Sequence, residues 1–166
     1  MTAETAHALL NGLAPDEAAR ALARCCGSSR WVAAMLAARP FASEAALHRT
    51  ADDAWAGLGA ADFLEAFSHH PAIGARAAPM SAWSAEEQSR AAASTATATT
   101  DALHTLNEAY AARFGYTFIV CATCKTADEI LALLRDRLDH DDATELAIAA
   151  AEQARITHLR LEKLAR

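Results

Sequence analysis

Polar residues that could do acid–base chemistry stand at a proline-bounded turn. His70 precedes Pro71 in the segment SHHPAIG, where Pro71 and Gly74 predict a turn or loop at a helix end. A rigid loop of this kind often holds a catalytic imidazole in a defined direction, although a solvated surface histidine is the simpler alternative. The simpler alternative applies more strongly to the remaining candidates, His7, His48, His104, His140 and His158.

The segment WSAEEQ, which contains Ser84, Glu87 and Gln88, has two interpretations. Ser84 and Glu87 have the spacing of a capping box, in which each side chain satisfies a backbone N–H at the other position. A carboxylate near a helix N-terminus is also held ionised by the helix dipole, and close to His70 it would favour the imidazolium form. The two residues would then form a general acid/base couple near neutral pH.

Other polar residues lie within expected helices. Arg160, in ITHLRLEKL, is either a solvated residue that neutralises the end of the last helix or a bidentate clamp on a carboxylate or ureido group. For Asn107 and Arg113, in LNEAYAARFG, we favour a structural role or an exposed face. A phosphate-binding glycine loop, a GxSxG elbow and an HExxH motif are absent from the sequence.

The elements that must position these residues are predicted to be helices. Hydrophobic residues make up 53% of the 166 residues but aromatic residues only 6%, so close packing of alanine-rich helices is expected in one domain spanning 1–166. Start and stop signals place helices over 15–27, 29–40, 43–55, 84–114, 126–138 and 143–164, with a further helix beginning at Asp62. The segment 116–122 (YTFIVCA) has no partner strand and is predicted to be a buried extended connector.

Charge and composition exclude several classes of function. A formal charge of -6 argues against non-specific nucleic-acid binding, which needs clustered Lys and Arg. Neither a secretory segment nor a run of about 18 apolar residues is visible, so we expect no membrane association and a cytoplasmic location. The four cysteines admit zinc binding or a CxxC redox role, but buried reduced thiols are favoured for Cys25, Cys26, Cys121 and Cys124.

A series of motifs in order covers the chain from near residue 13 to near residue 165. The series is CCGSSRW, RPF, HPAIG, WSAEEQ, LNEAYAARFGYTFIVCA, KTADEILALLRDRL and ATELAIAAAEQARITHLRLEKL. It resembles the OHCU decarboxylase family (2-oxo-4-hydroxy-4-carboxy-5-ureidoimidazoline decarboxylase). The resemblance implies an all-α, cofactor-free enzyme, commonly a homodimer, that converts the small molecule OHCU to (S)-allantoin and carbon dioxide in urate degradation.

The resemblance also implies roles for individual residues. His70 and Glu87 fall on the catalytic positions of the family. The remaining positions are expected to bind substrate: Pro71, Ser84, Gln88, Phe118, Ile119, Val120, Cys121, Ala122 and Arg160. Cys124 stands where many relatives have glycine, which leaves the local turn open to question.

Two other classes of protein remain as alternatives. A non-enzymatic helical interaction module would show an exposed apolar patch and no pocket around His70, Glu87 and Arg160. A metal- or thiol-dependent enzyme would lose activity with a chelator or after thiol alkylation, whereas the OHCU decarboxylase interpretation predicts indifference to a chelator.

Overall fold

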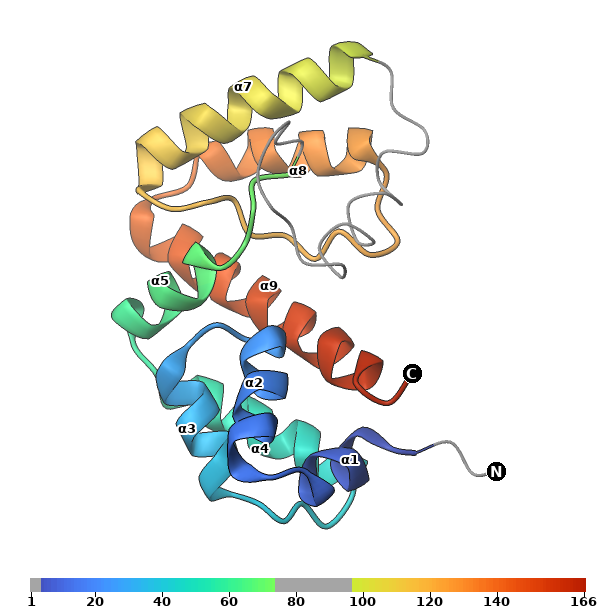
Figure 1. The fold of residues 1–166 in the computed structure, drawn as a ribbon. Helices are drawn as coiled ribbons and strands as arrows, with labels where there is room; N and C mark the ends of the chain where they lie inside the picture. Colours follow the sequence, from blue (N-terminus) through green and yellow to red (C-terminus); the bar gives the residue numbers. More distant parts are fainter. Residues whose placement is uncertain (1–3, 74–96) are drawn as a thin grey trace. The chain divides into compact units, whose positions relative to one another are not determined.

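The chain is helical throughout the residues that the computed structural model describes, 4–73 and 97–166 (Figure 1). These residues contain eight helices and no strand, which confirms the all-α prediction. The helices are α1 (Ala6–Gly12), α2 (Pro15–Cys25), α3 (Ser29–Ala37), α4 (Glu44–Ala56), α5 (Ala60–Ser68), α7 (Thr97–Phe114), α8 (Ala127–Leu138) and α9 (Asp142–Lys163). No helix in the described ranges combines the length and apolarity needed to cross a membrane.

The chain divides into two compact units. The first unit comprises Met1–Ala66 together with Gln153–Arg166, and the second comprises Phe67–Glu152. Helix α9 therefore contributes its first half to the second unit and its last turns to the first unit. The expectation of one domain over 1–166 stays a prediction.

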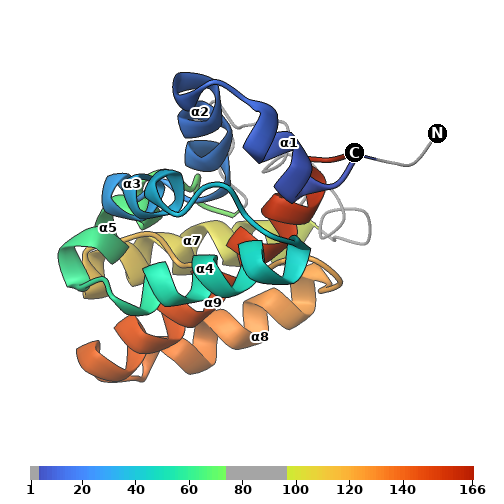
Figure 2. The ribbon, with the colours of Figure 1, turned by 90° about the horizontal axis from the view of Figure 1, so that it is seen from below.

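The first unit packs four short helices around large apolar side chains. Helix α2 contacts α3, α3 contacts α4, and α1 contacts both α2 and α4 (Figure 2). Trp31 and Met35 of α3 are both fully buried, and the Trp31 indole N–H donates to the Ala51 carbonyl at 3.1 Å. This bond satisfies the one polar atom of a buried tryptophan, as burial requires.

Helix starts in this unit follow the predicted caps with two small errors. Ser43 caps α4, since its hydroxyl accepts from the Ala46 N–H at 3.1 Å. The cap of α3 is Ser28 rather than the predicted Ser29, because the Ser28 hydroxyl accepts from the Trp31 N–H at 3.3 Å. Helix α5 begins at Ala60, two residues before the predicted Asp62, whose carboxylate instead accepts from the Gly59 N–H at 3.0 Å.

The second unit is built on the packing of α7 against α8. Its core contains Tyr110 from α7 and Ile130 and Leu134 from α8, all fully buried. Gly115 ends α7 with a φ of +81°, the left-handed conformation that glycine adopts most readily. Of the long segment predicted over 84–114, residues 97–114 are confirmed as helix, and residues 84–96 lie outside the described residues.

The predicted start of α8 at residue 126 is confirmed by a capping box. The Thr126 hydroxyl accepts from the Glu129 N–H at 3.2 Å, and the Glu129 carboxylate accepts from the Thr126 N–H at 2.7 Å. Helix α9 is within one residue of its predicted bounds at each end. Leu161 of this helix is fully buried.

An extended connector joins α7 to α8, as predicted (Figure 1). Residues 117–122 have no helical or strand assignment, yet the five side chains from Phe118 to Ala122 are all buried. A buried segment without a neighbouring strand must find partners for its backbone N–H and C=O groups elsewhere. The side chains that supply them define the surroundings of this connector.

Candidate active site

The described residues include only part of the predicted site. His70, Pro71, the connector residues 118–122 and Arg160 lie within them, whereas Ser84, Glu87 and Gln88 lie outside. The geometry of the acid/base couple and the choice between capping and catalysis for Ser84 and Glu87 therefore stay predictions. Arg160 belongs to the first unit, and His70, Pro71 and the connector belong to the second.

His70 lies in a short turn that begins at the end of α5. The helix ends at Ser68, and the His70 N–H donates to the Phe67 carbonyl at 3.0 Å. Pro71 follows directly, and both residues are partly buried. The predicted turn at a helix end is confirmed, and the hydrogen bond and the proline ring together limit the backbone freedom of the histidine.

Asn107 ties the downstream side of this turn to α7. Its side-chain amide donates to the Ile73 carbonyl at 2.9 Å and to the Leu103 carbonyl at 2.8 Å, and the residue is only 6% exposed. The side-chain oxygen of Asn107 is buried and accepts no hydrogen bond within the described part of the chain. The structural role that the sequence favoured for Asn107 is thus supported: the residue holds the turn that carries His70.

The turn and the connector pack against the same core. Ile73 and the connector residues Phe118, Val120 and Ala122 all contact the apolar cluster of α7 and α8. The ring of Phe67, at the end of α5 just before the turn, and the ring of Tyr116, just before the connector, have centroids 5.3 Å apart. The structure therefore brings together two of the segments that the sequence analysis assigned to the site.

Connector side chains alternate between two surroundings. Phe118, Val120 and Ala122 belong to the core cluster of α7 and α8, whereas Ile119 and Cys121 are buried outside that cluster. This alternation is the period of two that an extended backbone imposes. The five residues predicted to bind substrate thus do not present one common face.

Charged side chains bind the connector backbone at alternate residues. An Arg137 guanidinium N–H donates to the Ile119 carbonyl at 2.6 Å, and the Cys121 N–H donates to the Glu152 carboxylate at 2.6 Å. The Lys125 ammonium donates to the Cys121 carbonyl at 2.8 Å. These bonds replace the ladder of a neighbouring strand, and because charged groups take part they are stronger than neutral bonds.

Glu145 is the centre of the buried network behind the connector. Its carboxylate is 0% exposed and accepts from Arg137 Nε at 2.8 Å and from the Tyr110 hydroxyl, with His140 Nδ1 at 3.0 Å. Burial, followed by the hydrogen bond to Glu145, raises the pKa of Tyr110 far above its usual range, so this hydroxyl stays a donor. Neither Arg137 nor Glu145 was predicted from the sequence, since nothing local distinguishes them from solvated charges.

Arg160 is buried in the first unit, and its exposed fraction of 6% shows that the solvated interpretation is wrong. One guanidinium N–H lies 3.5 Å from the Arg24 carbonyl. Its positive charge also acts on the thiols of Cys25 and Cys26. A buried guanidinium agrees with a residue held in a fixed direction.

The cysteines divide into three buried thiols and one exposed thiol. Cys25, Cys26 and Cys121 are buried as predicted, but Cys124 is exposed, which corrects the expectation for that residue. Burial is the main cause that raises the pKa of Cys25 to about 12 and that of Cys26 to about 11. Both thiols therefore stay protonated at neutral pH and are poor nucleophiles and poor metal ligands.

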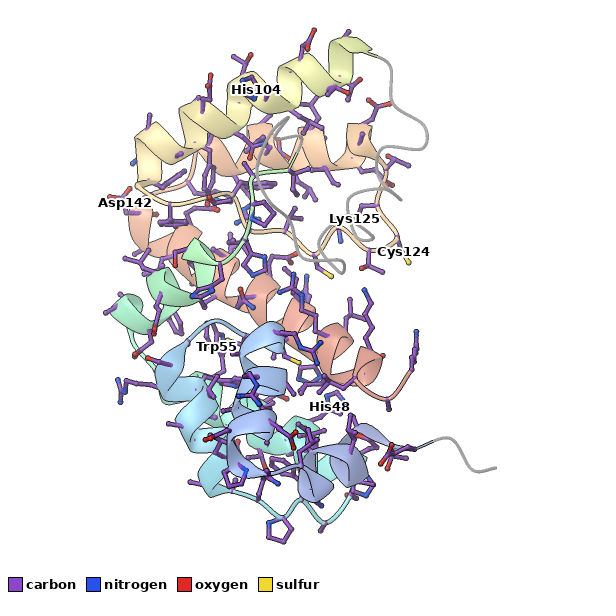
Figure 3. The ribbon with its side chains drawn as sticks, in the orientation of Figure 1. His48, Trp55, His104, Cys124, Lys125 and Asp142 are labelled. Carbon is purple, nitrogen blue, oxygen red and sulfur yellow. The ribbon has the colours of Figure 1, made fainter. Side chains whose placement is uncertain are left out.

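Cys124 occupies a left-handed position in the turn after the connector, next to Lys125 (Figure 3). Its φ is 65°, a conformation that residues with a Cβ adopt at a cost of about 1–2 kcal/mol. A glycine would adopt this backbone without that cost.

The other histidines are less solvated than predicted. His104 is exposed on α7, but His48 and His158 are partly buried, with their Nδ1 atoms 3.0 Å apart and His158 Nε2 2.6 Å from Asp52. His140 is also partly buried and contacts Glu145. No group of three or more His, Cys, Asp or Glu suited to a metal ion occurs in residues 4–73 and 97–166.

Comparison with known proteins places the chain in a family. The profile of the OHCU decarboxylase family matches residues 11–162. The uric acid degradation bifunctional protein TTL of Arabidopsis thaliana is 40% identical over 146 residues, which is 84% of this chain but only 45% of that protein. The 2-oxo-4-hydroxy-4-carboxy-5-ureidoimidazoline decarboxylase of Haloferax volcanii is 32% identical over 138 residues, 80% of each chain.

Solved structures agree with this assignment. A crystal structure of OHCU decarboxylase in the presence of (S)-allantoin superposes with a TM-score of 0.77 and 38% identity, covering 86% of this chain and 94% of that chain. A structure of (S)-allantoin synthase, with 21% identity and a TM-score of 0.70, supports the fold alone. Since the family profile extends over most of the sequence, the chain belongs to the OHCU decarboxylase family.

Proposed function

We propose that this chain is an OHCU decarboxylase, which converts 2-oxo-4-hydroxy-4-carboxy-5-ureidoimidazoline to (S)-allantoin and carbon dioxide in urate degradation. The observation that carries the proposal is the family match over residues 11–162. The relative crystallised in the presence of (S)-allantoin, 38% identical to this chain, supports the product. The joint packing of the His70 turn and the connector supports the assignment of these two segments to one site.

The proposed reaction breaks the bond between the ring carbon and its carboxylate. The electron pair of that bond moves into the conjugated imine and carbonyl groups of the substrate as carbon dioxide leaves, so the chemistry requires no cofactor. A proton then adds to one face of the ring to give the (S) product. The protein contributes orientation, electrostatics and control of the protonated face.

His70 and Glu87 are proposed to carry the acid/base step. In this proposal His70, polarised by Glu87, contacts the hydroxyl or carboxylate at the reacting carbon and promotes the loss of carbon dioxide. The ring and ureido atoms would be held by Pro71, Ser84, Gln88 and Arg160. The hydrogen bond from the His70 N–H to the Phe67 carbonyl at the end of α5 supports a defined backbone position for the residue that carries the imidazole.

The connector is proposed to bind the planar ring through its backbone and through the side chains that face away from the core. Phe118, Val120 and Ala122 pack into the core of α7 and α8, so Ile119 and Cys121 are the side chains left for apolar contact. Among the described residues, none makes a hydrogen bond with the Val120 backbone, although Val120 is 6% exposed. A buried N–H and C=O of this kind suit the donors and acceptors of a ureido group or an imidazoline ring.

An assay with substrate made in place tests the activity. OHCU is generated from urate with urate oxidase and hydroxyisourate hydrolase, and its decay is followed by ultraviolet absorbance and circular dichroism. We expect faster formation of optically active (S)-allantoin with this protein, unaffected by a chelator. An unchanged rate of OHCU decay would refute the proposed function.

His70→Asn tests the assigned base. A positioned acid or base contributes about 10²–10⁴-fold, so a folded His70→Asn protein should lose at least about a hundredfold in turnover. Near-normal turnover in this variant would remove the mechanism while leaving the activity itself in place. For Glu87→Gln, a melt beside the kinetics separates a lost cap, which costs about 1 kcal/mol, from a lost acid/base partner.

Homodimer formation, which the family resemblance implies, and a cytoplasmic location, which we expect from the sequence, are further parts of the proposal. Light scattering of the purified protein at several concentrations measures the first, and a dimer mass is expected. Neither nucleic acid nor a membrane is proposed as a partner, given the formal charge of -6.

A further inference from the structure

Arg137 connects a buried carboxylate to the backbone of the connector. The residue is 5% exposed, and its Nε and Nη2 atoms donate to Glu145 while Nη1 donates to the Ile119 carbonyl at 2.6 Å. Its guanidinium carbon also lies 4.5 Å from the centre of the Phe118 ring. One rigid planar group thus fixes both the carbonyl of one connector residue and the ring of the residue before it.

The network is costly to bury and is fully satisfied. Glu145 is completely buried, and Arg137, Tyr110 and His140 all surround its carboxylate. Burying an ion pair removes two charges from water, at a free-energy cost that two apolar side chains in the same place would not have. A buried ion pair is therefore weak evidence for a purely stabilising role. What the pair adds over an apolar core is direction, because the guanidinium fork accepts only one arrangement of its partners.

By fixing the direction of the Ile119 carbonyl, Arg137 also fixes the direction of the backbone N–H of the next residue, Val120. In an extended segment, the N–H and C=O groups of successive residues point to opposite edges. The Ile119 carbonyl and the Cys121 N–H are held by Arg137 and Glu152, so the Val120 groups point to the edge that these side chains leave uncovered. Rotation of the Ile119 carbonyl would turn the Val120 N–H away, since both belong to one planar peptide.

We propose that Arg137 is a positioning residue for substrate binding: oriented by Glu145, it fixes the peptide between Ile119 and Val120 in the direction that the substrate requires. This inference rests on the proposed function, in which the connector binds OHCU. It predicts a defect in substrate affinity rather than in proton transfer, since Arg137 is not assigned to the acid/base step.

The test uses two variants of the network and one matched control. Arg137→Met with Glu145→Gln removes the guanidinium without leaving a lone buried carboxylate, and Arg137→Lys keeps the charge beside Glu145 but cannot bridge to Ile119 at the same time. The control is Arg113→Met, because Arg113 likewise pairs with a carboxylate of α9 (Asp142, 2.6 Å) and stacks on a phenylalanine (Phe114, 4.6 Å) without touching the connector.

Steady-state kinetics on OHCU and amide hydrogen exchange of the peptide 116–122 are measured for all variants. Both Arg137 variants should fold, raise KM by about tenfold with kcat within about threefold of the wild type, and keep the pH profile of kcat. The connector amides should exchange faster in these variants and at the wild-type rate in Arg113→Met. The exchange measurement needs no substrate, so it decides the positioning role even if the wild-type protein does not act on OHCU.

Several results would overturn the inference. A folded double variant with the KM and connector exchange of the Arg113→Met control would show that Arg137 does not position the connector. Failure of both Arg137 variants to fold would show that the residue is structural, and the inference would be withdrawn. An unchanged KM beside faster exchange would separate the connector from substrate binding and reject the proposal as well.

Discussion

The hydrogen bonds of Asn107, one of which holds the His70 turn, predict how its substitution changes both the stability of the protein and its kcat. Replacing Asn107 with Leu removes the donor to the Ile73 carbonyl (2.9 Å) and the donor to the Leu103 carbonyl (2.8 Å) at similar side-chain volume. Ile73 lies three residues after His70, and its carbonyl is the only one of these two acceptors outside a helix. The substitution therefore loosens the turn without altering the imidazole.

The expected change in stability is small because two effects oppose each other. Each lost bond costs about 1 kcal/mol net, whereas removal of the buried, unpartnered Asn107 side-chain oxygen returns about 1 kcal/mol or more. Asn107→Leu should thus lower the free energy of unfolding by about 1 kcal/mol and the Tm by about 2–4 °C. If the energy of the Ile73 bond is fully expressed at the active site, about 1 kcal/mol corresponds to about a fivefold lower kcat.

Thermal melts by circular dichroism and the OHCU decay assay measure the two quantities on the same preparations. Thr105→Ala is the matched control, because Thr105 also bonds a backbone carbonyl of α7 (Asp101, 3.1 Å) but is exposed and does not contact the turn. We expect the control to keep wild-type kcat. A folded Asn107→Leu protein with the kcat of Thr105→Ala would refute the view that this tie positions His70.

Three further predictions follow from the turns, thiols and caps. Cys124→Gly should raise the Tm by about 2–4 °C by relieving about 1 kcal/mol at a φ of 65°, whereas Gly115→Ala, at a φ of +81°, should lower it by a similar amount in the same melts. At neutral pH a thiol reagent should modify Cys124 rapidly, while Cys25 and Cys26, whose burial raises the pKa to about 12 and about 11, react only after unfolding; fast labelling of the native pair would contradict this. Hydrogen bonding from Thr126 lowers the pKa of Glu129 below 4.5, so the stability that its ionised carboxylate contributes is fully present above 4.5 and is lost as the pH falls through the lower folded value. The Tm difference between the wild type and Glu129→Gln should therefore shrink in acid, and a difference that grows in acid would be incompatible with this cap.

Local signals predicted most helix boundaries because a cap or a turn involves residues that are close in sequence. The Thr126–Glu129 box and the Ser43 cap are complete within four residues, and Gly115 ends its helix by its own backbone freedom. The errors in the predicted helix starts are also small, one or two residues along the chain. Ser28 and Ser29 are equally good caps by type, and the tertiary position of Trp31 decides between them.

Positions of charged groups could not be predicted in this way. Arg160 was expected to be solvated if it had no role in the site, and it is buried. Glu145 lies in the first turn of α9, where a carboxylate ordinarily faces water and the helix dipole, and it is 0% exposed. Its burial depends on Arg137 in the preceding helix and Tyr110 in α7, and no local pattern reports such partners.

The buried charged side chains supply the hydrogen bonds that the extended connector needs. A run of β-branched and aromatic residues favours an extended backbone, but a strand is stable only when another strand completes its hydrogen bonds, and the described residues contain none. Arg137, Glu152 and Lys125 meet the same demand with side chains, which fix individual peptide groups rather than a whole edge. A ladder would occupy both edges of a central strand, whereas these side chains hold the Ile119 and Cys121 groups at one edge. Among the described residues, the Val120 N–H and C=O have no hydrogen-bond partner, as the proposed substrate binding requires. Arg137 of α8 and Glu152 of α9 therefore allow an extended segment to be buried among helices, and they set its backbone geometry.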